Sequence, residues 1–288
     1  MSAPATDPPF ARVGIVGLGL IGGSAALGLR AAWPSVWIAG VDSAPIAEAA
    51  HAQKIIDEPR DSARALADLD LILLATPVVA IIETIADLGR AGVSTVVTDV
   101  GSTKRRILEA AESARLVDFV GGHPMAGSER GGLEAARADL FRAKSWLLSP
   151  ASTASAEARD RVARLVQGLG ALPTTVTPDA HDRAVAYLSH LPQLLAGGLM
   201  ITGAEALGES GLSYAGRGFD EMTRLAASSY AVWESILDTN ADYIAEALQA
   251  MLATMPDSIG ADATQLRELF ARANRWRECL DERRGTAR

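Results

Sequence analysis

The chain has 288 residues, of which 49% are hydrophobic, and a net charge of −8. That length is sufficient for two domains, and that apolar share for a sizeable buried core. The acidic balance argues against nucleic-acid binding, which depends on a clustered basic surface, so we expect no nucleic-acid partner. A small anionic ligand needs only a locally positive pocket and stays compatible with this charge.

Three features of the sequence favour a cytoplasmic protein. The single cysteine, Cys279, cannot form an intrachain disulfide, which fits a reducing compartment. Residues 1–9 lack the basic and apolar regions of a secretory signal. The apolar run 69–82 is interrupted by Asp70 and Pro77 and is too short to span a bilayer, so we expect no membrane segment.

Strands and helices are predicted to alternate over the first part of the chain. We expect strands at 13–16, 37–41, 69–76, 94–100, 119–122, 144–148 and 174–176. Helices are expected at 21–32, after Asp42, and at 78–88, 103–114 and 157–169. This alternation predicts an α/β fold, a doubly wound Rossmann sheet of parallel strands with right-handed crossovers.

The alternation stops near residue 176. Thr177, Pro178 and Asp179 are typical of a helix start, as N-cap, first-turn proline and acidic first-turn residue. The remainder of the chain is predicted to be helical almost to its end. We therefore expect a Rossmann domain over 1–176 and an all-α C-terminal domain over 177–288.

A glycine-rich turn follows the first strand. Gly17-Leu18-Gly19-Leu20-Ile21-Gly22 has the spacing of a dinucleotide-binding turn. Gly17 allows the sharp exit from the strand, Gly19 lets the pyrophosphate approach the backbone, and Gly22 lets the helix pack closely. The pyrophosphate would then lie at a helix N-terminus, where free N–H groups favour negative charge.

Two further segments extend this predicted cofactor site. Asp42 ends the second strand, where a carboxylate binds the ribose 2′-hydroxyl and repels a 2′-phosphate, so NAD is favoured over NADP. A second interpretation makes Asp42 the N-cap of the next helix. Thr76 and Pro77 follow the strand at 69–76 and are expected to lie near the nicotinamide ribose, although Pro77 also suits a helix start.

Candidate catalytic residues follow the next two strands. Ser102 is either the N-cap of the following helix or a hydroxyl that faces the nicotinamide. His123 follows two glycines and precedes Pro124 at the end of a strand. A histidine beside NAD can accept the proton of a substrate hydroxyl, and its activity would fall near pH 6.5 if its pKa is unperturbed.

The predicted helical part holds a second group of polar candidates. His190 and Gln193 are three residues apart and share a helix face, beside a kink expected at Pro192. The other interpretation of His190 is a buried histidine with its hydrogen bonds satisfied. Arg224 is suited to bind a carboxylate or to form an internal salt bridge. Trp233 is interpreted as a pocket wall or a packing residue.

The remaining polar residues give weaker signals. Glu129, which precedes the helical part, is interpreted as an orienting residue or a solvated charge. His51 and His181 carry no functional signal, and the histidine spacing predicts no metal site.

Together these motifs resemble the prephenate/arogenate dehydrogenase family of tyrosine biosynthesis. The resemblance covers about residues 12–240 and is carried, besides the glycine turn, by segments that occur in the family's order. These segments are Asp99-Val100-Gly101-Ser102, Gly122-His123-Pro124-Met125-Ala126-Gly127-Ser128-Glu129, Ser189-His190-Leu191-Pro192 and Phe219 to Arg224.

The resemblance implies an NAD-dependent oxidative decarboxylation of prephenate to 4-hydroxyphenylpyruvate. His123 would accept a hydrogen bond from the substrate's 4-hydroxyl, Ser102 would hold His123, and Arg224 would bind a substrate carboxylate. Residues Glu129, His190, Gln193 and Trp233 would line the substrate pocket. The C-terminal helices would form a homodimer, which suits the apolar helix at 194–207.

Two departures from the family pattern leave the substrate open. Many prephenate-specific members have histidine where this chain has Gln193, so use of arogenate, or of both substrates as a cyclohexadienyl dehydrogenase, is the alternative. Glu221 replaces a usual aspartate, and Ser228-Ser229-Tyr230 replaces a usual Ser-Asp-Pro. The chain ends at Arg288, so we expect tyrosine feedback, if it occurs, to act at the active site rather than through a regulatory domain.

Two other functions compete with this interpretation. A Rossmann dehydrogenase for small hydroxy acids would usually carry a lysine base on the first helix after the Rossmann domain, but no lysine follows Lys144. A catalytically silent NAD sensor would bind the cofactor and show no turnover.

Overall fold

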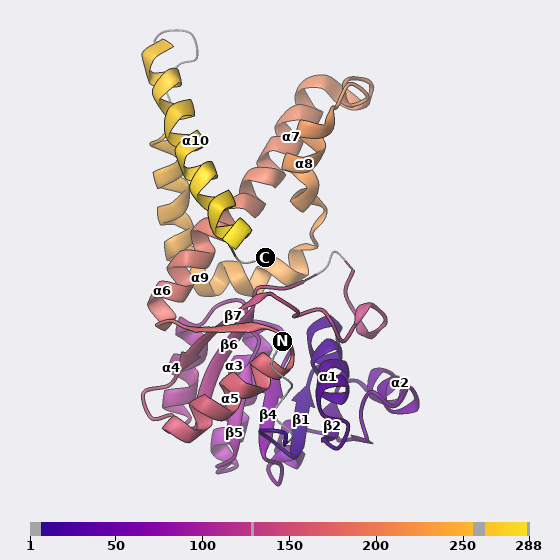
Figure 1. Cartoon of the computed structure of the whole chain (residues 1–288). Helices are drawn as coiled ribbons and strands as arrows, with labels where there is room; N and C mark the ends of the chain where they lie inside the picture. Colours follow the sequence, from indigo (N-terminus) through magenta and orange to yellow (C-terminus); the bar gives the residue numbers. More distant parts are fainter. Residues whose placement is uncertain (1–6, 128–129, 256–262, 287–288) are drawn as a thin grey trace. The chain divides into compact units, whose positions relative to one another are not determined.

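A computed structural model describes residues 7–127, 130–255 and 263–286 (Figure 1). The chain forms two compact units, Met1–Ala241 and Asp242–Arg288. The domain boundary predicted at 176/177 stays a prediction.

The first unit begins with an eight-stranded sheet in the order β3-β2-β1-β4-β5-β6-β7-β8. Its strands are β1 (Arg12–Val16), β2 (Trp37–Val41), β3 (Glu58–Pro59), β4 (Leu71–Leu74), β5 (Val96–Asp99), β6 (Phe119–Pro124), β7 (Ser145–Pro150) and β8 (Leu172–Thr175). The helices between them are α1 (Leu20–Ala32), α2 (Ala44–Ala52), α3 (Val78–Arg90), α4 (Arg105–Ser113) and α5 (Ala156–Gly168). The doubly wound α/β class is confirmed, and β3 is the strand that the sequence did not predict.

One strand corrects the expectation of a fully parallel sheet. β7 runs antiparallel to β6, whereas the other neighbouring strands are parallel. The connection from β6 to β7 has, in its described part, only the short 3₁₀ turn η2 (Leu133–Ala135). Parallel neighbours need a crossover, usually through a helix, and without one the chain returns in the opposite direction.

Helices cover both faces of the sheet. Along β1, Val13 and Ile15 belong to the core beneath α1 and α5, while Val16 belongs to the core beneath α3 and α4. Successive strand residues point to opposite faces, so a strand segment buried on both sides must be apolar, as β4 is throughout and β1 is after Arg12.

The carboxyl ends of β1, β4, β5 and β6 meet at one edge of the sheet because these strands are parallel. The glycine turn after β1, Thr76 after β4, Ser102 after β5 and His123 near the end of β6 therefore lie along one edge. This is the edge at which open α/β sheets bind ligands.

Helices follow the sheet, as predicted. α6 (Pro178–Val185) is capped, as expected, by Thr177, whose hydroxyl accepts a hydrogen bond from the N–H of Ala180 at 3.2 Å. A π-helical turn, Ala186–His190, then precedes α7 (Leu191–Leu212), which has Pro192 in its first turn. A π turn just before Pro192 thus stands in place of the kink predicted at that proline; such a distortion often occurs at functional sites.

Three further segments complete the first unit. They are α8 (Arg217–Thr223), the 3₁₀ turn η4 (Arg224–Ala227), and the beginning of α9 (Tyr230–Leu252). α9 is interrupted at Asn240, whose backbone is not helical (φ −139°, ψ 21°). The rest of α9 and α10 (Ala263–Thr286) belong to the second unit, in which the apolar side chains of Phe270, Trp276 and Leu280 on α10 are exposed.

The helical run Pro178–Leu212 is, within the described residues, long and apolar enough to cross a membrane, and 28% of its most apolar window is buried. Length and composition are weak grounds for a membrane span, because a core helix of a soluble protein passes the same test. The run also carries Asp182 and His190, which are buried inside the first unit.

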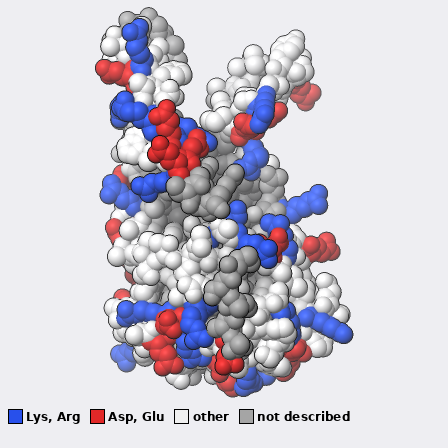
Figure 2. All heavy atoms as spheres, viewed as in Figure 1, with Lys and Arg blue, Asp and Glu red and all other residues white. Residues whose placement is uncertain are grey.

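The surface charge is mixed. On the face drawn in Figure 2, basic and acidic side chains are interspersed.

The glycine turn offers a paired test of the fold. A Cβ at Gly22 would lie 1.8 Å from the carbonyl oxygen of Gly17, whereas a Cβ at Gly19 would meet nothing within 4 Å. Overpacking costs about 1–3 kcal/mol where neighbours can shift, so we expect Gly22→Ala to lower the free energy of unfolding by at least about 3 kcal/mol. Gly19→Ala should change it by less than about 0.5 kcal/mol. Urea unfolding measures both, and equal losses would contradict this packing.

Candidate active site

A cavity of about 830 Å³ lies in the first unit, at the carboxyl edge of the sheet. The glycine turn and the segments that follow β4, β5 and β6 form one part of its wall, and η4 and the start of α9 form the other. Eight of the predicted site residues line it: Gly19, Leu20, Ile21, Thr76, Pro77, Ser102, Arg224 and Trp233.

The glycine turn has the geometry of an anion cradle. Gly17 has φ +92°, a conformation that glycine adopts without strain. α1 begins at Leu20 without a side-chain cap and without an acidic residue in its first turn, so its first N–H groups are left for a ligand. The open space above Gly19 would admit a pyrophosphate.

Asp42 fastens this turn to the end of β2. Its carboxylate accepts hydrogen bonds from the N–H of Leu18 and from the N–H of Ser43, each at 2.7 Å. The N-cap position of α2 belongs to Ser43, so the interpretation of Asp42 as the N-cap is wrong.

The hydroxyl of Thr76 is a buried polar group to which a bound cofactor could form a hydrogen bond. It has no hydrogen-bond partner among the described residues, although the residue lines the cavity. Buried hydroxyls are rarely left without a partner, so this position suits a ligand. Together with the glycine turn and Asp42, it fits a dinucleotide.

Ser102 does not cap α4. That helix begins at Arg105, with Lys104 at the N-cap position, and Ser102 lines the cavity instead. The described structure shows no hydrogen bond between Ser102 and His123, so that expected contact stays a prediction.

A buried ion pair orders the ends of β5 and β6. Asp99 accepts hydrogen bonds from the N–H of Gly101 at 2.7 Å and of Gly122 at 3.0 Å, and it pairs with the ammonium of Lys104. Both side chains of the pair are fully buried. Burial lowers the pKa of Lys104 from its ordinary value, against the opposing effect of Asp99. Because Gly122 precedes His123, the pair also fixes the strand that carries His123.

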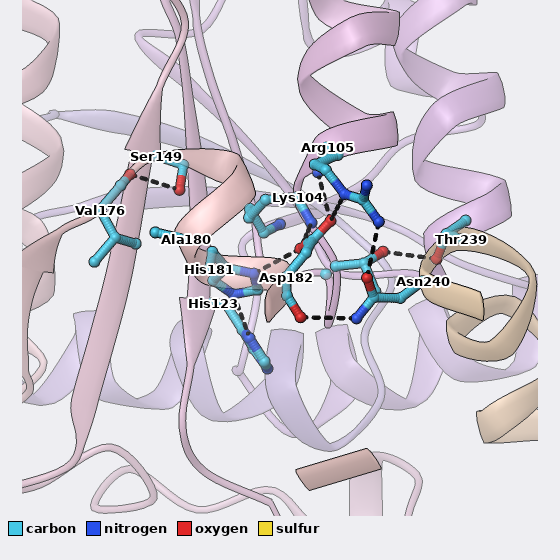
Figure 3. Close-up of polar contacts among 12 residues, drawn as sticks. Lys104, Arg105, His123, Ser149, Val176, Ala180, His181, Asp182, Thr239 and Asn240 are labelled. Carbon is cyan, nitrogen blue, oxygen red and sulfur yellow. Dashed lines mark hydrogen bonds and ion pairs between the residues drawn. The ribbon is translucent and has the colours of Figure 1, made fainter. Parts of the chain in front are cut away.

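Asp182 of α6 caps α4 from outside that helix (Figure 3). Its carboxylate accepts hydrogen bonds from the N–H of Lys104 at 2.6 Å and from the N–H of Arg105 at 2.9 Å, and the guanidinium of Arg105 adds a contact at 3.2 Å. Burial alone would raise the pKa of Asp182, but its hydrogen bonds with the His181 ring and the two N–H groups leave that pKa below its ordinary value.

His123 shares a hydrogen bond with a second histidine. Its Nδ1 lies 2.9 Å from Nε2 of His181, and Nδ1 of His181 lies 2.8 Å from Oδ1 of Asp182. Burial lowers the pKa of His123 well below 6.5, and the neighbouring His181, Lys104 and His190 lower it further. Burial likewise lowers the pKa of His181, although Asp182 opposes the shift. His123 is therefore a neutral imidazole at neutral pH.

The rings of His190 and Trp233 lie against each other, a contact that the sequence did not predict. The two rings are perpendicular, with centroids 5.7 Å apart. His190 is buried, and its Nδ1 lies 3.3 Å from the amide nitrogen of Asn240, which also donates to the backbone carbonyl of Asp182 at 2.9 Å. Burial lowers the pKa of His190 to about 4.

Gln193 connects α7 to the segment that carries Arg224. Its amide nitrogen donates to the carbonyl of Leu225 at 2.8 Å, and its amide oxygen accepts from the Ser228 hydroxyl at 3.2 Å. The departures at Ser228 and Glu221 thus have local partners, since Glu221 pairs with Arg217 on α8 at 2.7 Å. Glu129 lies outside the described residues.

Sequence reasoning missed His181, Asp182, Lys104 and Asn240. The only signal for the first two was a pair of adjacent titratable residues in the first turn of a helix, which is ordinary on a solvated surface. Their burial depends on how α6 packs against α4, which no local pattern encodes. In the described part of the chain, no three or more His, Cys, Asp or Glu residues group as a metal site.

Family models match nearly the whole chain. Residues 25–174 match the nucleotide-binding domain of prephenate dehydrogenase, and residues 177–272 match its dimerization domain. The chain belongs to the prephenate dehydrogenase family. The predicted family is thereby confirmed.

Individual members of the prephenate dehydrogenase family agree with this assignment. The prephenate dehydrogenase of Bacillus subtilis (strain 168) is 33% identical over 92% of this chain and 75% of that protein. The cyclohexadienyl dehydrogenase of Zymomonas mobilis is 30% identical over 89% of this chain and 90% of that protein. The crystal structure of the A. aeolicus prephenate dehydrogenase in complex with hydroxyphenyl propionate and NAD⁺ superposes with a TM-score of 0.79, at 29% identity and 96% coverage of both chains.

Because its buried histidines are held in the neutral form, we expect the free energy of unfolding of this protein to fall in acid. The unfolded chain takes up protons near pH 6.5, whereas folded His190 resists protonation down to about pH 4. The stability from neutral burial is therefore present above about pH 6.5 and falls as the pH is lowered, by roughly 2 kcal/mol at pH 5 for His190 alone.

Urea unfolding at about pH 7.5 and about pH 5 measures this loss. His190→Gln should reduce the difference between the two pH values, whereas His51→Gln at an exposed position should leave it unchanged. An equal free energy of unfolding at both pH values would contradict the burial of neutral histidines.

Proposed function

We propose that this chain is an NAD-dependent prephenate dehydrogenase, which oxidises and decarboxylates prephenate to 4-hydroxyphenylpyruvate. The observation that carries the proposal is a neutral, hydrogen-bonded His123 on the sheet edge where a dinucleotide cradle and Arg224 share one cavity. Membership of the prephenate dehydrogenase family and similarity to a relative that binds NAD⁺ support it.

The residues that would hold NAD are those that form the cradle. The turn Gly17–Gly22, with Leu20 and Ile21 in the first turn of α1, would bind the pyrophosphate, and Asp42 would bind the adenosine ribose. Thr76 and Pro77 would contact the nicotinamide ribose. Bound NAD supplies the acceptor for the hydride that leaves C4 of the substrate.

The chain's own residues would bind the substrate and accept a proton. Arg224 in the cavity wall would bind a substrate carboxylate, because a guanidinium matches a carboxylate with two parallel hydrogen bonds. His123 would accept the 4-hydroxyl proton, with Ser102 holding the hydroxyl in place. When the ring carboxylate leaves as CO₂, its bonding electron pair would enter the ring, which becomes aromatic, and the C4 oxygen would take the proton back from His123. Glu129, His190, Gln193 and Trp233 complete the proposed pocket.

The alternative substrate is arogenate, alone or together with prephenate. The similarity to a cyclohexadienyl dehydrogenase supports this alternative. The two substrates differ in a side chain that carries a keto group in prephenate and an ammonium in arogenate. Gln193 presents a neutral amide, which discriminates against neither.

We further propose a cytoplasmic homodimer formed through the C-terminal helices, without nucleic-acid or membrane partners. The match to a dimerization domain supports the dimer, as do exposed apolar residues of α7, namely Leu194, Leu199, Ile201 and Leu207. Light scattering should give the mass of two chains, and the mass of one chain would contradict it.

The proposed activity is tested by NADH formation with prephenate and with arogenate. His123→Asn should lower kcat by about 10²- to 10⁴-fold, because it removes the proton acceptor, while the Kd for NAD stays unchanged. A wild-type enzyme that forms no NADH from either substrate would refute the proposal. A His123→Asn variant with normal kcat would refute the role of His123.

The pH dependence adds a sharper test of His123. A base is active when unprotonated, so kcat/KM should fall only as the pH drops through its pKa. Since that pKa lies well below 6.5, activity should persist below pH 6.5, rather than fall near that value as an unperturbed histidine would predict. A pH–rate profile measures this, with circular dichroism showing that the protein is folded at each pH.

For variants at Gln193 we expect a change in KM rather than in kcat. Because its amide holds Leu225 and Ser228 beside Arg224, Gln193→Ala should raise KM for prephenate and arogenate by a similar factor, about tenfold, through loss of positioning. Gln193→His keeps a polar side chain and is the matched comparison. A change in KM for one substrate alone would show that Gln193 reads the substrate side chain instead.

A further inference from the structure

His123, His181 and Asp182 form a continuous row of hydrogen bonds (Figure 3). Asp182 and His181 are buried, and His123 is half-buried at the end of the row. The row joins β6 to α6, two segments 58 residues apart in the chain. Its direction follows from which atoms can donate and which can accept.

The donor and acceptor roles along the row are set first at Asp182. Its carboxylate already accepts from two backbone N–H groups and a guanidinium, and a pKa below the ordinary value keeps it ionised. An ionised carboxylate only accepts hydrogen bonds, so Nδ1 of His181, 2.8 Å away, must carry a proton.

The protonation of His181 in turn decides the direction of its hydrogen bond with His123. A lowered pKa keeps His181 neutral, so its single ring proton is on Nδ1 and its Nε2 is an acceptor. Nδ1 of His123, 2.9 Å from that acceptor, must then be the donor. His123 is also neutral, which leaves its Nε2 without a proton. Nε2 has no hydrogen-bond partner among the described residues.

This arrangement reverses the intrinsic preference of histidine. A free neutral histidine side chain prefers its proton on Nε2, which would leave Nε2 unable to accept another. The partner of one ring nitrogen decides which tautomer is present. Asp182 cannot reverse its role, because the N-terminus of α4 and Arg105 hold its oxygens.

We propose that His181 and Asp182 are positioning residues that hold His123 in its Nδ1–H tautomer and present Nε2 as the proton acceptor. The assignment of the accepted proton to a substrate hydroxyl rests on the proposed function, whereas the tautomer does not. During the reaction the O–H bond breaks, an N–H bond forms at Nε2, and the oxygen keeps the electron pair as the carbonyl forms. The resulting imidazolium still donates from Nδ1 to His181.

The charged and titratable groups around the row are consistent with this role. Lys104 lies near both histidines but is paired with Asp99, so the two together add no net charge. His190 is held neutral by burial at neutral pH. Asp182 is paired with Arg105, and it is the carboxylate in direct hydrogen-bond contact with His181, through which it stabilises the His123 imidazolium.

The test is nitrogen NMR of the full chain labelled with ¹⁵N-histidine. The chain has four histidines, His51, His123, His181 and His190, so single glutamine variants assign the signals. At about pH 7.5 we expect His123 and His181 each to carry the proton on Nδ1. A proton on Nε2 of His123 in the wild-type protein would overturn the proposal, whether or not the enzyme turns over either substrate.

Two variants at position 181 distinguish a role of His181 in positioning His123 from a purely structural role. A leucine cannot accept from His123, so His181→Leu should move the His123 proton to Nε2 and lower kcat about 10- to 100-fold, with KM and the Kd for NAD unchanged. A glutamine can accept from His123 and donate to Asp182, so His181→Gln should keep the tautomer and most of kcat.

A His181→Leu protein with the wild-type tautomer and kcat would overturn the proposal, as would a His181→Gln protein that behaves like His181→Leu. If His181→Leu fails to fold, the wild-type spectrum and His181→Gln still decide the question. If neither substrate is turned over by the wild-type protein, the proposed function fails while the spectrum still reports the tautomer.

Discussion

The fully buried carboxylate of Asp182 joins the sheet layer to the helices that follow it. A charge in this position costs several kcal/mol of desolvation unless donors surround it. The N–H groups of Lys104 and Arg105, the Arg105 guanidinium and the His181 ring are those donors. Asp182 therefore fixes α6 against the N-terminus of α4, and the π turn that ends at His190 follows directly from α6.

The same constraint connects the fold to the chemistry. Asp99 and Lys104 hold the ends of β5 and β6 in place, and thus the backbone of His123. Asp182 holds His181, whose hydrogen bond fixes the ring of His123. Burial keeps the three histidines of this region neutral, which costs stability in acid but preserves a proton acceptor at neutral pH. Stability and function depend on the same lowered pKa values.

Most of the fold could be predicted from the sequence, because apolar runs and turn residues are local signals. The predicted strands and helices of the sheet layer begin and end within two residues of those observed. The antiparallel direction of β7 and the cap of α4 were not predictable locally. The first depends on the path of the connection after β6, and the second on the carboxylate of Asp182, which belongs to another helix. For the same reason His181 had no functional signal, although Gly19, Ser102 and Arg224 were placed on the cavity.

The central claim is that His123 accepts a substrate proton at Nε2 while His181 holds its Nδ1. The most direct measurement is a crystal structure of this chain with NAD and 4-hydroxyphenylpyruvate. We expect the phenolic oxygen within hydrogen-bond distance of Nε2 of His123, with the Nδ1 contact to His181 preserved. A phenolic oxygen bound to another side chain, with Nε2 of His123 turned away from it, would contradict this role of His123.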